Sequence, residues 1–319
     1  MENLIGFVEF KSGIPVRGDT LGEIYQAKFG EQDVSIHFPC LPEKPHDYTI
    51  QELLPPKGCE IRLSGSWGQL RSHNSIQYKA DTCIAVVSQV YIVCQTEDPD
   101  NASDDIFHNI DKWRDSLKAV ICLENKIVVD NLWVSSITTE RGSIVLCRTR
   151  PKVKAYDNRS VINISSSVIT LEDILTKEKL LTIFRLTDCK NKLKLEYELL
   201  LQAYIERAKG NYRYSLIQAL SAIEVCVDVK INYLCDEKEI DTNRLIGRKS
   251  LGEKFEILKA FGVNWLTKNP NEEIVKHRND LFHMRVLSPS LQRLNDVISA
   301  VEMYLREYSK TYYDEELLQ

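Results

Sequence analysis

The hydrophobic period of this chain changes once, near Leu171, and that change limits the folds that the sequence can adopt. Before this point, short runs of β-branched and aromatic residues alternate with turn signals, as in the strands of a half-buried sheet. After it, apolar residues recur every three to four positions, as on one face of an α-helix. A length of 319 residues suits two domains better than one. The sequence therefore predicts an α+β protein with domains at residues 1–169 and 170–319.

The first domain is predicted to be rich in strands, which turn signals such as Lys11-Ser12-Gly13 and Arg141-Gly142 separate. One amphipathic helix interrupts the strands, with apolar residues at helical spacing from Ile106 to Leu117 and an N-cap at Ser103 or Asp104. The expected strands are Leu4–Phe10, Val34–Phe38, Ile61–Leu63, Cys83–Val93, Lys126–Val134, Ser143–Cys147 and Val161–Ile169.

The second domain is predicted to be an up-and-down bundle of helices with short loops. Gly210-Asn211 separates two helices of a hairpin, and Ser250 with Glu253 forms a capping box for a later helix, which Gly262 can end. The one long polar insert, Cys235–Lys249, is a candidate for a mobile loop. The expected helices are Leu171–Leu186, Lys192–Lys209, Tyr212–Leu234, Leu251–Phe261, Asn271–Met284 and Ser290–Ser309.

Charge and cysteine usage exclude several classes of protein. The formal net charge of -5 argues against a protein that coats duplex DNA through general charge, so any contact with nucleic acid must be local. The nine cysteines form no Cys-x-x-Cys pair, which predicts reduced thiols in the cytoplasm. The first residues lack the pattern of a signal peptide, and no apolar run is long enough to span a bilayer. We therefore expect a cytoplasmic protein without a membrane partner.

The sequence offers no convincing metal or cofactor site. The acidic stretch Glu97–Asn101 lacks the glycine and the terminal glutamate of a calcium loop, so we interpret it as a solvated loop that leads into a capped helix. A Gly-rich phosphate loop, a Gly-x-Ser-x-Gly elbow and a His-Glu-x-x-His zinc motif do not occur in the sequence. We therefore expect neither a metal nor a cofactor.

The residues best suited to chemistry lie in Arg278-Asn279-Asp280-Leu281-Phe282-His283. At 100° per residue of a helix, Asn279 and His283 lie about 40° apart, whereas Arg278 lies about 140° from His283. One straight helix thus does not aim Arg278 and His283 at the same point. Two copies of the helix, packed across a two-fold axis, can form clefts that take groups from both chains. The spacing therefore favours a homodimer.

An arginine and a histidine can cleave RNA without a metal, because the nucleophile can be the substrate's own 2′-OH. Histidine has a pKa near neutrality, so it can accept the 2′-OH proton or protonate the leaving oxygen. The guanidinium of arginine offers a fork of donors to the phosphate as its charge grows. The residues alone also fit a second interpretation, a surface helix on which Arg278 and His283 form caps or salt bridges.

The second half of the chain resembles a HEPN domain (higher eukaryotes and prokaryotes nucleotide-binding). In that family an Arg-polar-x3-His signature lies on a late helix of a four- or five-helix bundle, and the stretch from Arg278 to His283 matches its spacing and its polar second residue. The segment Tyr214–Glu224 is similar to an earlier family helix that often carries an Ala-Leu/Ile-Glu element. The resemblance covers roughly residues 190–309. Within the family the chain most resembles the Apea-like group, which has a β-rich N-terminal region and is linked to bacterial antiphage defence.

The resemblance implies a metal-independent endoribonuclease with a composite site at the interface of a homodimer formed through the bundle. It implies that Arg278 contacts phosphate, that His283 is the general acid and base, and that Asn279 orients groups in the site. Glu224 would position Arg278, or it is only a polar residue beside the apolar stripe of its helix. RNA would be the substrate, and a phage-derived or small-molecule trigger would act on the N-terminal domain in abortive infection. Two alternatives stay open: a catalytically inactive HEPN module that binds nucleic acid or a ligand or only dimerises, and the RNase toxin of a toxin–antitoxin pair.

Basic residues alternate at Arg148, Arg150, Lys152 and Lys154. In an extended segment all four side chains point to one side, where they can follow an RNA backbone. Pro151 lies in the middle of the segment and favours the edge of a sheet. Cations on an edge strand also prevent edge-to-edge pairing, so the pattern allows either RNA binding or protection of the edge.

Overall fold

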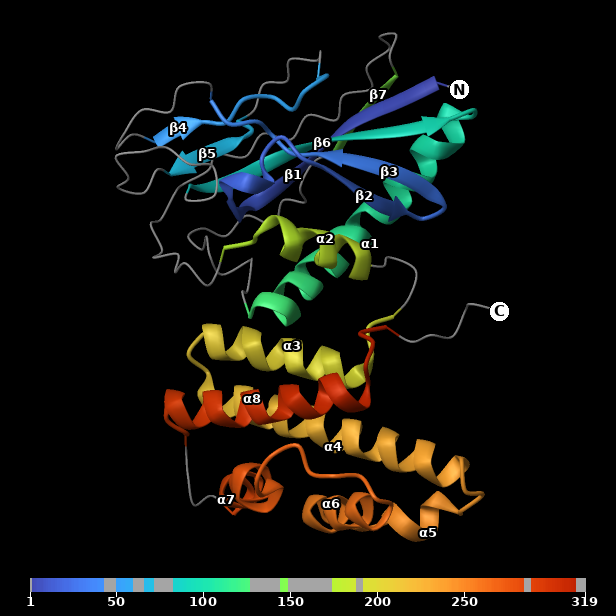
Figure 1. Ribbon diagram of the computed structural model, residues 1–319, viewed down its shortest axis with the longest axis vertical. Helices are drawn as coiled ribbons and strands as arrows, with labels where there is room; N and C mark the ends of the chain where they lie inside the picture. Colours follow the sequence, from blue (N-terminus) through green and yellow to red (C-terminus); the bar gives the residue numbers. More distant parts are fainter. Residues whose placement is uncertain are drawn as a thin grey trace. The chain divides into compact units, whose positions relative to one another are not determined.

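The computed structural model describes residues 2–42, 50–59, 66–71, 83–126, 144–148, 174–187, 192–283 and 288–313. The chain divides into two compact units, Met1–Lys190 and Asn191–Gln319, which we call the sheet unit and the helical unit (Figure 1). The described part of the sheet unit holds an antiparallel sheet and two α-helices, whereas that of the helical unit is built from helices. The predicted α+β class is confirmed.

The described strands of the sheet unit form one seven-stranded sheet in the order β2-β3-β6-β1-β7, with β5 on β6 and β4 on β5. Every pairing between these strands is antiparallel. A 3-10 turn, η1 (Gly18–Thr20), follows the first strand. The strands are β1 (Glu2–Arg17), β2 (Ile24–Phe29), β3 (Gln32–His37), β4 (Ile50–Glu52), β5 (Gly68–Arg71), β6 (Ile84–Thr96) and β7 (Ile144–Arg148).

The expected turn at Lys11-Ser12-Gly13 is wrong, because β1 continues through it. The strand pairs with β6 on both sides of this point, and the register shifts between Glu9 and Ile14. Gly13 has a φ of +66°, and a Cβ atom there would lie 2.4 Å from Cγ1 of Val86. The glycine therefore forms a bulge, which bends a strand without ending it.

The other strand predictions differ in outcome. The strands expected at Leu4, Val34, Cys83 and Ser143 are present as β1, β3, β6 and β7, with shifted ends. The strands β2, β4 and β5 were not predicted. The segments Ile61–Leu63, Val161–Ile169 and residues 127–134 lie outside the described residues, and Lys126 ends a helix instead of starting a strand.

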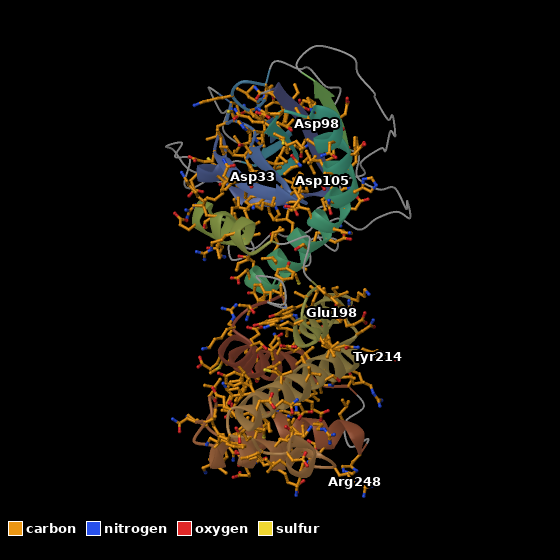
Figure 2. The ribbon with its side chains drawn as sticks, turned by 90° about the vertical axis from the view of Figure 1, so that its right-hand side faces the viewer. Asp33, Asp98, Asp105, Glu198, Tyr214 and Arg248 are labelled. Carbon is orange, nitrogen blue, oxygen red and sulfur yellow. The ribbon has the colours of Figure 1, made fainter. Side chains whose placement is uncertain are left out.

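Helix α1 (Pro99–Asn125) runs along one face of the sheet (Figure 1). Its cap is Asp98, whose side chain accepts a hydrogen bond from the backbone N–H of Asn101, so the expected cap at Ser103 or Asp104 is wrong. Proline in the first turn suits this early start, because proline lacks the N–H that would lie there without a partner. Figure 2 labels Asp98 at this end of the helix. Of the acidic stretch Glu97–Asn101, Asp98 is thus the N-cap, and the residues from Pro99 onward form the first turn of α1.

Helix α2 (Lys177–Leu186) belongs to the sheet unit. Its Phe184 lies with its ring centroid 5.1 Å from that of Tyr25 on β2 and 6.2 Å from that of Trp113 on α1. The domain boundary therefore falls after Lys190 and not after residue 169. The helical period of α2 predicts the helix correctly, but a period does not tell which unit the apolar face packs against.

The start of α2 also differs from the expected Leu171. Leu175 forms a parallel bridge with Val16, and Thr176 caps the helix by accepting a hydrogen bond from the backbone N–H of Lys179. Residues 174–176 are therefore extended, and residues 171–173 lie outside the described part of the chain.

The helical unit contains the expected helices with small shifts at their ends. Ser250 and Glu253 form both hydrogen bonds of the predicted capping box. A short helix, α5, lies inside the insert Cys235–Lys249, and the first turn of the helix expected at Asn271 is a π-helix, η5. The elements are α3 (Leu195–Ala208), α4 (Tyr212–Asp236), α5 (Thr242–Ile246), α6 (Leu251–Ala260), η5 (Asn271–Val275), α7 (Lys276–Phe282) and α8 (Leu291–Tyr308).

Helix α4 packs against α3, α8 and α6 and is the centre of the bundle (Figure 1). Buried hydrogen bonds fix these helices. The Ser215 hydroxyl donates to the carbonyl of Ala203 at 2.7 Å, and the hydroxyl of Tyr204 on α3 donates to the Glu302 carboxylate on α8. A buried polar group without a partner is costly, so these bonds specify one arrangement of α3, α4 and α8.

Candidate functional site

The segment that leads into α7 is held by hydrogen bonds on both of its sides. The hydroxyl of Tyr304 on α8 accepts from the backbone N–H of Leu266 at 3.2 Å. The indole N–H of Trp265 donates to the carbonyl of Phe255 on α6 at 3.4 Å. The π-helix η5 follows this anchored segment and continues directly into α7. Single π-helical turns are often found at functional sites.

One side of η5 and α7 is buried. Ile274 is fully buried, and Leu281, seven residues later, is 3% exposed. Residues seven positions apart lie on nearly the same face of a helix, so these two side chains define the inner side of α7.

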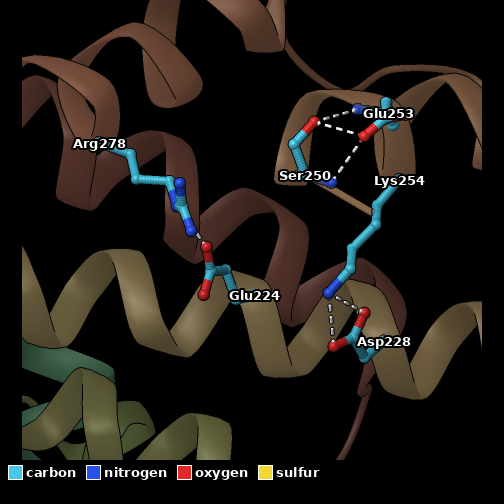
Figure 3. A network of polar contacts seen from close by, with 6 residues as sticks. All are labelled: Glu224, Asp228, Ser250, Glu253, Lys254 and Arg278. Carbon is cyan, nitrogen blue, oxygen red and sulfur yellow. Dashed lines mark hydrogen bonds and ion pairs between the residues drawn. The ribbon is translucent and has the colours of Figure 1, made fainter. Parts of the chain in front are cut away.

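Arg278 lies on one flank of this inner side and binds α4. Its Nε donates to Oε1 of Glu224 at 2.5 Å, and both side chains are about one third exposed, at 30% and 34% (Figure 3). The structure thus brings together two residues that the sequence singled out in separate helices. The contact is a charge-assisted hydrogen bond, which is stronger than one between neutral groups.

A second ion pair lies beside it on the same helix. Asp228 follows Glu224 by one turn of α4 and binds Nζ of Lys254 on α6 at 2.7 Å (Figure 3). Two carboxylates of α4 therefore each hold a cation from a different helix. The pair of Asp228 and Lys254 was not predicted from the sequence.

The opposite flank of α7 is bound by Arg293 of α8. Nε of Arg293 donates to Nδ1 of His277 at 2.7 Å, and its terminal nitrogen donates to the Asp280 carboxylate at 2.9 Å. Burial lowers the pKa of His277, and the guanidinium of Arg293 adds to this effect. A neutral ring with a lone pair on Nδ1 fits this hydrogen bond, because a protonated ring would have an N–H at both nitrogens.

Asn279 and His283 occupy the outer side of α7, where both are exposed. His283 is the C-cap of the helix, and its backbone N–H donates to the carbonyl of Asn279 at 2.9 Å. The angles expected from the spacing are consistent with this arrangement, since Arg278 turns toward α4 while Asn279 and His283 face outward. Within one chain the structure joins Arg278 to Glu224 and leaves His283 on a different side of the helix.

The basic segment is described only at its start. Arg148 ends β7, which among the described strands pairs with β1 alone and is therefore an edge strand. Arg150, Lys152 and Lys154 lie outside the described residues. Both interpretations of this segment, RNA binding and protection of the edge, remain predictions.

The part of the chain that the structure describes contains neither a cluster of metal-ligating residues nor a membrane-spanning helix. Its residues contain no group of three or more histidine, cysteine, aspartate or glutamate side chains that could hold a metal ion. In the same part of the chain, no helix is long and apolar enough to cross a membrane.

Comparisons of this chain with protein-family models, with curated proteins and with solved structures found no match. The resemblance to HEPN domains therefore rests on the six-residue motif, on the segment Tyr214–Glu224 and on their setting in a helical bundle.

Proposed function

We propose that the helical unit is a metal-independent endoribonuclease of the HEPN type. The observation that carries the proposal is the ion pair between Arg278 and Glu224. It joins the two sequence elements on which the resemblance depends, although they lie 54 residues apart in the chain. A surface helix with unrelated caps and salt bridges would give no reason for these two elements to meet.

The proposed reaction uses the 2′-OH of the RNA as its nucleophile. The neutral imidazole of His283 accepts the 2′-OH proton while O2′ bonds to the adjacent phosphorus and the bond from phosphorus to O5′ breaks. The leaving O5′ takes a proton from an imidazolium, which gives a 2′,3′-cyclic phosphate and a 5′-hydroxyl end. Arg278 donates to the phosphate oxygens as their charge grows, and Asn279 orients the reacting groups. The step requires neither a metal nor a cofactor.

The site is proposed to be completed by a second copy of the chain through the helical bundle. Arg278 and His283 lie on different sides of one α7, so a partner helix can bring its own group to the phosphate. Helix α4, which carries Glu224, exposes large apolar side chains, with Tyr214 at 62%, Val229 at 47% and Tyr233 at 55% (Tyr214 is labelled in Figure 2). Such side chains suit contact with another protein surface better than contact with water.

We further propose that the enzyme is an effector of antiphage defence in the bacterial cytoplasm. In this proposal the sheet unit binds a phage-derived or small-molecule trigger, and RNA cleavage then stops the infected cell. Deleting the sheet unit and finding unchanged cleavage and toxicity would count against control by that unit.

A non-catalytic binding module is the second candidate function, and one observation favours it. The guanidinium of Arg278 already has a carboxylate partner in Glu224. A phosphate must therefore share or displace this contact before Arg278 can stabilise a transition state. A module that only binds RNA or dimerises has no such requirement.

The test is cleavage of tRNA and mRNA by the purified full chain in EDTA. We expect wild type to cleave, His283→Ala to lose about 100- to 10,000-fold in rate, and Arg278→Ala to lose activity as well. The matched control is His108→Ala, which removes another exposed histidine on α1. An RNA with a deoxyribose at the scissile position should resist cleavage.

The possible results separate the two candidates. Cleavage that persists in both His283→Ala and Arg278→Ala would overturn the site. RNA that is bound but never cleaved by wild type would favour the binding module. A strictly monomeric protein in solution would overturn the composite site.

A further inference from the structure

We propose that Lys276 binds a backbone phosphate of the RNA next to the one that is cleaved. This inference rests on the proposed function, because it extends the same site by one residue. Lys276 is the first residue of α7 and is exposed, as are Asn279 and His283. The three residues are spaced by three and four positions, which places them within about 60° of one another on a helix. They form one row along the outer side of α7, which we call the outer row.

The charges around α7 support this assignment. Arg278 is turned toward Glu224, Arg293 is bound to His277 and Asp280, and Lys254 is bound to Asp228. Each of these three cations therefore has a carboxylate partner within the bundle. Lys276 forms no salt bridge with any described residue. Of these four cations, it is the one that shares the outer side of α7 with His283.

The length of the outer row leaves room for a second phosphate beside the one that is cleaved. Seven residues of α-helix rise about 10.5 Å, so the backbone of Lys276 lies about two turns from that of His283. That separation lets Lys276 and His283 contact two neighbouring positions on a strand that runs along α7. The lysine side chain is a flexible point charge and does not need the fixed geometry of a bidentate contact. The expected ligand is therefore single-stranded RNA, held by its backbone charge.

The salt dependence of RNA binding tests the proposal. Each phosphate contact to a single strand contributes about 0.7 to the slope of log affinity against log salt concentration. We expect Lys276→Ala to reduce this slope by about 0.7 in a His283→Ala background, which keeps the RNA intact. The affinity lost through Lys276→Ala should then shrink by about 2.6-fold between 50 and 200 mM salt. Lys276→Arg keeps the charge and should keep the slope.

The matched control is Lys112→Ala on α1, which removes the same charge from an exposed position of another helix. An unchanged slope in Lys276→Ala, or an equal loss in Lys112→Ala, would overturn the role of Lys276. If wild type binds RNA without cleaving it and Lys276→Ala alone lowers the slope, the proposed catalysis fails while the phosphate contact stands. If the full chain does not bind RNA at low salt, both proposals fail.

Discussion

The inner and outer sides of α7 differ in almost every physical property. The inner side carries the buried Leu281, and its flanks are tied to α4 through Arg278 and to α8 through His277 and Asp280. The outer side exposes the outer row, and its groups have no such ties to the bundle among the described residues. One short helix thus has two sides with different roles. The residues on one side bind α7 to the bundle, and the residues on the other side can contact a ligand.

The residues of the Arg-Asn-x3-His motif lie on both sides of α7. Arg278 belongs to the inner side through Glu224, whereas Asn279 and His283 belong to the outer side. Substitutions within the motif should therefore not behave alike. A change on the inner side should affect folding and activity together, and a change on the outer side should affect activity alone.

The largest effect on stability is expected for Leu281→Ala. This side chain is 3% exposed, and truncating a buried leucine costs about 2–5 kcal/mol, through lost burial and the cavity left behind. Asn279→Ala, two residues away on the outer side, should change stability by less than about 0.5 kcal/mol. Urea unfolding followed by circular dichroism at helical wavelengths measures both. Equal losses in the two variants would remove the distinction between the sides.

A smaller effect, on activity, is expected for Glu224→Gln. The ion pair with Arg278 is partly exposed, so losing the charge should cost only about 0.5–1 kcal/mol of stability. Activity should fall by about tenfold if the carboxylate holds the guanidinium in its catalytic position, since that corresponds to about 1.4 kcal/mol.

Asp228→Asn provides the matched comparison for this prediction. It weakens the neighbouring ion pair on the same helix, and its carboxylate is as exposed as that of Glu224, but its partner is Lys254 on α6. The two variants should lose similar stability, and only Glu224→Gln should lose activity. A loss of the same size in Asp228→Asn would mean that both pairs act by holding the bundle together.

Much of the fold follows from local sequence signals. The capping box at Ser250 and Glu253 and the glycine at position 262 are set by neighbours within a turn, and the structure agrees with both. The bulge at Gly13 and the place of α2 were missed for a shared reason. A glycine suits a bulge as well as a turn, and an amphipathic helix can pack on a sheet as well as on other helices, so tertiary contacts decide each case.

The same limit applies to the site. The spacing of Arg278 and His283 is enough by itself to place them on different sides of a helix. The pairing of Arg278 with Glu224 came from a family resemblance and not from spacing. The contact between Arg293 and His277 could not be predicted, because Arg293 is on another helix and no local pattern joins the two residues. The period of a helix predicts the direction in which each side chain points, but it does not identify the residue on another helix that the side chain contacts.

The smallest expected effect concerns His277 and the pH dependence of stability. Burial lowers its pKa from the usual value near 6.5; Arg293 and Lys276 act in the same direction, whereas Asp280 and Asp296 oppose them. Between the lowered pKa and about 6.5, the unfolded chain binds more protons than the folded one, so stability rises with pH. This contribution is complete above about pH 6.5 and is lost as the pH falls toward the lowered pKa.

His277→Asn removes this pH-dependent contribution to stability and keeps the hydrogen bond. The amide oxygen can still accept from Arg293, but the amide does not titrate. Unfolding free energies measured by urea titration between about pH 5 and 7.5 should fall more steeply on acidification for wild type than for His277→Asn. His37 in the sheet unit also has a lowered pKa through burial, but it is present in both proteins and cancels in the comparison. Parallel pH profiles would show that the contact between Arg293 and the flank of α7 does not depend on a neutral His277. The inner side of α7 would then tolerate a charge at this position as readily as the outer side does.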